Sequence, residues 1–95
     1  MESNEIYKQK MVARLKRHCA EINALDVKAE NAAIDTKLRY VEELDVLHTK
    51  KREAIKKICE LENASGEIWG KVQLTVDEVS NDLGTGIAHA ATMFK

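Results

Sequence analysis

The sequence predicts an all-α protein folded as an antiparallel helical hairpin, and three observations lead to that class. The 95-residue chain contains no proline, and its four glycines all lie in the last third. Aromatic residues make up 4% of the chain, too few for a typical β-sandwich or β-barrel. The hydrophobic fraction of 44% and the formal net charge of −1 are unlike those of disordered chains. A single helical, coiled-coil-like domain over residues 1–95 is therefore expected.

A first helix is predicted over about residues 4–63, because this stretch has neither Gly nor Pro to stop it. Apolar positions in each half follow alternating gaps of four and three, the spacing of a heptad seam. The two seams are out of phase by one residue, which predicts either weak supercoiling or a local change of phase near residues 33–39. Val41, His48 and Ile55 widen the second seam, as suits a helix with two neighbours. The seams are Met11, Leu15, His18, Ile22, Leu25, Ala29 and Ala32, then Tyr40, Leu44, Leu47, Lys51, Ala54, Ile58 and Leu61.

A second, shorter helix is predicted over about residues 67–93, after a break at residues 63–66. Gly66 can adopt the left-handed conformation that ends the first helix. Alternatively, Ser65 can cap the N-terminus of the second helix. Gly84 and Gly86 predict fraying or a kink unless packing holds the helix. Its apolar face is Trp69, Val72, Val76, Val79, Leu83, Ile87, Ala90 and Phe94.

Helices of such unequal length predict self-association. The second helix covers only about residues 35–62 of the first, which leaves the N-terminal apolar stripe bare. We therefore expect a homodimer with a four-helix-type bundle, whose interface is Met11, Leu15, His18, Ile22 and Leu25. The alternative is a bend near residues 31–36, which would give a monomeric three-helix bundle. The expected core is Met11, Leu15, Ile22, Leu25, Leu38, Val41, Leu44, Leu47, Ile55, Ile58, Leu61, Trp69, Val72, Val76, Val79, Leu83, Ile87 and Phe94.

No residue pattern in the chain predicts catalysis, a cofactor or a metal. His18, His48 and His89 are far apart in the sequence, whereas structural zinc needs about four converging ligands. The Glu-x-x-His motif of di-iron bundles is missing, and the glycines at 84 and 86 lack the remainder of a phosphate loop. Cys19 and Cys59 are expected to be small buried hydrophobes. We therefore expect no enzyme activity, no catalytic residues and no cofactor.

Charge and hydropathy narrow the expected partners. Basic blocks at residues 8–17 and 50–57 alternate with acidic ones, a pattern that can select register and orientation in helical bundles. A net charge of −1 and a pI of about 6.3 argue against nucleic acid. The chain has no membrane-spanning run and no secretory signal, and its two cysteines suit reduced thiols, so the cytoplasm is expected.

Several short segments resemble a family of small bacterial coiled-coil proteins found in cyanobacteria and proteobacteria. The most specific segment is Ala-Ser-Gly-Glu-Ile-Trp at residues 64–69; others are Ala-Glu-Ile-Asn-Ala-Leu at 20–25, Tyr-Val-Glu-Glu-Leu at 40–44 and Ala-Thr-Met-Phe-Lys at 91–95. The resemblance covers nearly the whole chain and implies an all-α helical hairpin without catalytic residues. His18 and Cys19 depart from the family pattern, where an aromatic residue is frequent. Trp69 followed by Gly70 is similar, more weakly, to the turn of small secreted helical hairpins with a Trp-x-Gly motif.

These observations together predict a non-enzymatic interaction protein that associates with itself, and with another helical protein as a further partner. The alternative is a lipid-surface protein whose hairpin opens on anionic membranes, since residues 83–94 carry no formal charge. Interfacial helices usually have a Lys/Arg-rich polar face, however, and the second helix has only Lys71 and Lys95.

Overall fold

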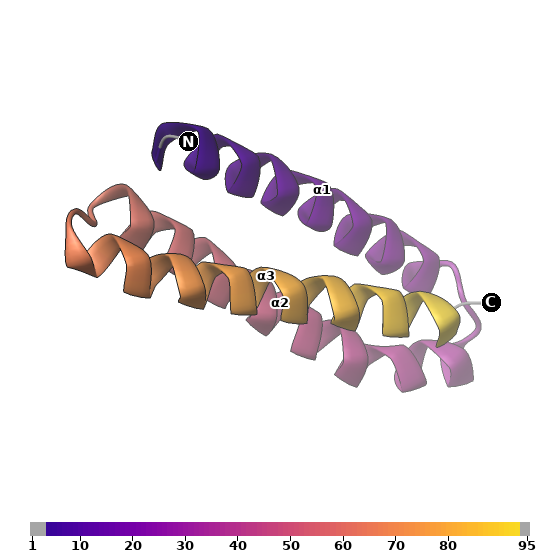
Figure 1. Cartoon of the computed structure of the whole chain (residues 1–95). Coiled ribbons are helices and arrows are strands. Elements are labelled where there is room, and N and C mark those ends of the chain that lie inside the picture. The colour runs from indigo at the N-terminus through magenta and orange to yellow at the C-terminus, as the bar shows by residue number, and fades with distance from the viewer. Residues whose placement is uncertain (1–3, 94–95) are drawn as a thin grey trace.

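The computed structural model describes residues 4–93, which form three α-helices and no strands (Figure 1). Helix α1 spans Asn4–Glu30, α2 spans Ile34–Glu62 and α3 spans Glu67–Met93. The helices run up, down and up in one elongated bundle, 51 × 18 × 17 Å in extent. No described helix combines the length and the apolar character needed to cross a membrane. The all-α class is confirmed, but the two-helix hairpin is not, because the chain forms three helices.

The predicted long helix is divided by a turn at residues 31–33. Ala33 adopts an extended conformation with φ −61° and ψ 152°, and no side chain caps the start of α2. The amide of Lys37 then donates the first hydrogen bond of α2 to the carbonyl of Ala33, at 2.8 Å. Three residues of helix are given up so that α1 can fold back and bury its apolar stripe, a gain worth about 1.5–3 kcal/mol for each large aliphatic side chain. The alternative bend near residues 31–36 is therefore the one that the structure shows.

The second turn follows the sequence prediction in part. Gly66 has a φ of 59°, the left-handed conformation that glycine adopts without steric cost. It immediately precedes α3 instead of ending α2, and its carbonyl accepts a hydrogen bond from the amide of Trp69. The end of α2 is closed at Asn63, where the amide of Asn63 donates to the carbonyl of Glu60 and the amide of Ala64 donates to the carbonyl of Leu61, each at 3.2 Å.

The core runs along the axis of the bundle in two clusters. The larger contains Ile22, Leu47 and Leu83, each without measurable exposure. The smaller contains Met11, Ile58, Leu61 and Val76. The predicted core is wrong for three members, which are exposed, and Phe94 lies outside the described residues. The three are Leu38 at 67%, Val41 at 43% and Ile55 at 40% exposure.

The free end of α1 is fastened to α3 by polar and aromatic contacts. The Tyr7 hydroxyl donates to Oδ1 of Asp77 at 2.5 Å and lies 3.3 Å from the carbonyl of Gln73. The Tyr7 ring meets the Trp69 ring edge to face at 5.9 Å, and Lys8 Nζ lies 5.7 Å from the Trp69 ring centroid. Aromatic pairs of this geometry add about 0.5–1.5 kcal/mol beyond their burial. These contacts hold α1 against the bundle at the end opposite the 31–33 turn.

Gly86 explains why α3 does not kink where the sequence predicts weakness. It is buried, and a Cβ placed on it would lie 2.9 Å from Cδ2 of Leu47. The missing side chain lets α2 and α3 approach closely at the centre of the core. Gly70, by contrast, has open space where its Cβ would be.

We expect Gly70→Ala and Gly86→Ala to change the free energy of unfolding in opposite directions. Gly70→Ala should raise it by about 0.5–1 kcal/mol, because alanine restricts the unfolded chain and meets no neighbour. Gly86→Ala should lower it by about 1–2 kcal/mol, because overpacking against Leu47 exceeds the gain in helix propensity. Urea denaturation of both variants tests this. Equal changes would contradict the close approach of α2 and α3.

The uncapped start of α2 gives a second prediction. Ala33→Ser should raise the free energy of unfolding by about 0.5–1 kcal/mol, because a serine hydroxyl can accept a hydrogen bond from an amide in the first turn. Ala32→Ser, one residue before the cap position, serves as the control and should change little. If the two variants shift the denaturation midpoint alike, α2 does not begin where the structure places it.

Candidate interaction surface

The five residues predicted as a self-association interface lie inside the chain's own bundle. Met11, His18, Ile22 and Leu25 are buried to 5% exposure or less, and Leu15 is half-buried against both core clusters. The bare stripe from which the interface was predicted is therefore absent. Within one chain these side chains are covered by α2 and α3.

His18 is the one titratable side chain among these five. It packs against α3 at Gly84, which has no side chain to obstruct it. A Cβ on Gly84 would lie 3.4 Å from His18 Nε2. Burial lowers the pKa of His18 below its ordinary value; Glu21 opposes this shift, and Arg14 and Arg17 add to it. A buried neutral histidine of this kind serves the packing of α1 on α3.

A second heptad stripe runs along α2, about 100° around the helix from its buried seam, and it is largely exposed. It comprises eight positions separated by alternating gaps of four and three, like the core seam of the same helix. Seven positions are exposed and one, His48, is half-buried. We call this set the α2 outer stripe: Ile34, Leu38, Val41, Asp45, His48, Arg52, Ile55 and Cys59.

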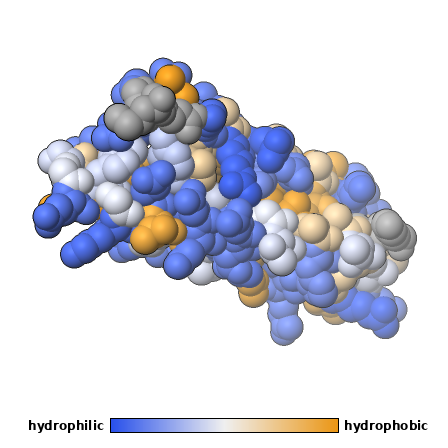
Figure 2. Space-filling view, viewed as in Figure 1, coloured by the Kyte–Doolittle hydropathy of each residue, from blue (hydrophilic) through white to orange (hydrophobic). Residues whose placement is uncertain are grey.

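The α2 outer stripe gathers four of the large apolar side chains that the bundle leaves in solvent. Ile34 is 76% exposed and Leu38 is 67% exposed, and both lie near the 31–33 turn. Val27, at the end of α1, adds a further exposed side chain at 55%. Other exposed apolar residues, such as Leu74 on α3, are not part of a repeating set. The face in Figure 2 is mainly hydrophilic, with separate hydrophobic patches.

The middle of the α2 outer stripe is polar and tied to α1. His48 Nε2 lies 3.0 and 3.1 Å from the two carboxylate oxygens of Asp26. Both side chains are about one-third exposed, so this ion pair is screened and contributes little stability by itself. It does fix the His48 ring in the centre of the stripe. The stripe thus has apolar ends and a charged middle.

The sequence pattern indicates part of this surface but predicts it to be core. Val41, His48 and Ile55 indicate a widened seam, and the same spacing extends to Ile34 and Cys59. The spacing shows that α2 has two apolar sides. It does not show which side the rest of the chain covers.

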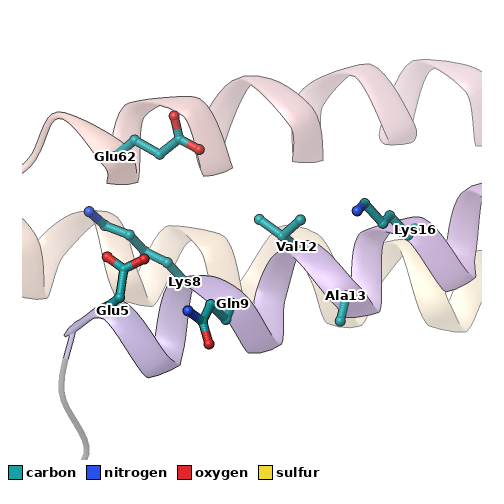
Figure 3. Close-up of a pocket in the computed structure, with 7 residues that line it drawn as sticks. All are labelled: Glu5, Lys8, Gln9, Val12, Ala13, Lys16 and Glu62. Atoms are coloured by element: carbon teal, nitrogen blue, oxygen red, sulfur yellow. The ribbon is translucent and has the colours of Figure 1, made fainter.

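A shallow hollow between α1 and the end of α2 offers little chemistry. It has a volume of about 570 Å³ and opens to solvent. Lys8, Gln9 and Val12 line it from α1, and Glu62 reaches it from α2 (Figure 3). Its lining contains no serine, cysteine or histidine. Across the described chain, no three His, Cys, Asp or Glu side chains gather as metal ligands.

Comparisons of the chain with protein-family models, curated proteins and solved structures found no match. The resemblance to small bacterial coiled-coil proteins stays a prediction.

The buried position of His18 predicts a pH-dependent stability. Because its folded pKa is lowered, the unfolded chain binds a proton more readily, so the stabilising contribution is complete above about pH 6.5. It is lost as the pH falls through the folded pKa. We expect the free energy of unfolding to decrease between about pH 7.5 and 5.5, as measured by urea denaturation. The variant His18→Gln should show a smaller decrease, whereas His89→Gln, on an exposed site, should keep it.

Proposed function

We propose that this protein is a non-enzymatic interaction protein that binds a partner helix through the α2 outer stripe. The observation that carries the proposal is the heptad spacing of exposed apolar residues on one helix side. Single exposed apolar residues are common on soluble proteins and need no explanation. A repeating set that begins with Ile34 and Leu38, at 76% and 67% exposure, has the pattern by which a helix receives another helix.

The charges of the stripe favour a protein partner over a lipid surface. Asp45, His48 and Arg52 interrupt the apolar positions at its centre, and a membrane-bound helix would have to place them among acyl chains. In a helix pair, such polar positions specify register and partner. Lipid binding is therefore the competing outcome in the experiment below.

A reducing compartment, the cytoplasm, suits this proposal. Cys19 and Cys59 are both free thiols, and Cys59 is exposed at one end of the stripe. An exposed thiol on an interaction surface is stable against oxidation only where thiols are kept reduced.

Photo-crosslinking tests the proposal with two equally exposed leucines. Benzoylphenylalanine at Leu38, which is 67% exposed, samples the stripe, and the same group at Leu74, which is 66% exposed, samples α3. In an extract of the source cells we expect a defined protein adduct from position 38 and none from position 74. The adduct is identified by mass spectrometry, and binding is then reproduced with the purified partner.

Vesicles provide the opposing arm. The purified full chain is sedimented with phosphatidylglycerol vesicles, and we expect it to stay in the supernatant. Lipid binding would replace the proposal if three results occur together. The chain sediments with the vesicles, Leu38→Lys abolishes this sedimentation, and position 38 forms no adduct. No adduct and no vesicle binding would remove the stripe as a functional surface.

A further inference from the structure

We infer that the partner of the α2 outer stripe is the same stripe on a second copy of this chain, docked antiparallel about a two-fold axis. This inference rests on the proposed function and specifies its occupant. It replaces the interface expected at Met11–Leu25 with one on a lateral face of α2, about 100° around that helix from its buried seam.

The stripe is complementary to itself when it is reversed. In an antiparallel helix pair, each a position of one helix faces a d position of the other. One antiparallel register places Ile34 opposite Cys59 of the second copy, Leu38 opposite Ile55, Val41 opposite Arg52, and Asp45 opposite His48. Apolar residues then meet at both ends, and the Asp45 carboxylate meets the His48 imidazole, a hydrogen-bonding partner, at the centre. The aliphatic stem of Arg52 can cover Val41 while its guanidinium stays in water.

The residues beside the stripe show the same complementarity. Asp35, Glu42, Thr49 and Lys56 follow one another at intervals of seven along one flank, and all are exposed. The antiparallel register sets Asp35 against Lys56 of the second copy and Glu42 against Thr49. A parallel pair would instead set Asp45 against Asp45 and Arg52 against Arg52, and like charges at core positions are costly.

Solution mass tests the occupant. Light scattering behind size exclusion, over a hundredfold range of concentration, should show the chain approach twice its mass of 10.7 kDa. Leu38→Lys should weaken dimerisation at least tenfold, because each interface buries two such lysines. Leu74→Lys, at a leucine of equal exposure on α3, should leave the dimer unchanged. A monomer at every concentration overturns the inference, and so does a dimer that Leu38→Lys does not weaken.

Thiol crosslinking tests the register. In a Cys19→Ala background, Ile34→Cys should crosslink to Cys59 of the second copy with a short bifunctional thiol reagent. Without Ile34→Cys, the two Cys59 thiols would be about 37 Å apart along the helix pair, and no crosslink should form. A crosslink through Cys59 alone shows parallel docking and overturns the inference.

Charge exchange supplies a test that does not depend on cysteine. Asp35→Lys and Lys56→Glu should each weaken the dimer, and the double variant should restore it because the opposed pair is rebuilt in reverse. Failure of the restoration contradicts the antiparallel register. These results separate the two proposals. If the chain is monomeric but still forms a position-38 adduct with another protein, only the inference of self-docking is overturned. The proposed function fails only when position 38 forms no adduct.

Discussion

Burial of the α1 stripe against α2 and α3 is the constraint on which the rest of the structure depends. Ile22 and Leu25 reach Leu47 and Leu83 only if α1 returns along the other two helices. The turn at residues 31–33 is the consequence, and it forms without Gly or Pro because the core interactions outweigh a few local helix hydrogen bonds. Once α1 occupies the inner side of α2, the outer side of α2 has no helix of its own chain left to cover it.

Much of the fold follows from local sequence patterns. The remaining part depends on whether helices of the same chain or of another chain bury the apolar stripe of α1. The spacing of Tyr40, Leu44 and Leu47, the left-handed Gly66 and the start of α3 were all readable from the sequence. The division of the first 60 residues into two helices was open only as the alternative bend near residues 31–36, because neither Gly nor Pro marks it. Either an intramolecular or an intermolecular neighbour can bury Ile22, and the local pattern is the same in both cases. The α2 outer stripe was read as core for the same reason.

The two sides of α2 differ in how they use polar residues. On the inner side, α1 and α3 supply specificity through shape, as where Gly86 admits Leu47. On the face of the α2 outer stripe, Asp45, His48 and Arg52 stand among apolar residues, and in the proposed antiparallel pair they would set its direction. Well-packed apolar cores give stability, whereas isolated polar positions in a helix seam select one register among several. This division suits a bundle that folds by itself and recognises by one helix.

The 31–33 turn is also the point at which α1 could exchange between chains. The apolar face of α1 can be buried by α2 and α3 of its own chain or by those of a neighbour. If the turn straightened, residues 4–62 would form one continuous helix. The α1 segment would then pack on α2 and α3 of a neighbour with the contacts that it now makes within its own chain. Such exchange of an identical element between protomers needs no new interface, only a connection that tolerates the extended form. A turn of asparagine and alanines tolerates it, whereas proline would not. The three residues of this turn, Asn31, Ala32 and Ala33, would thus set the barrier to such an exchange.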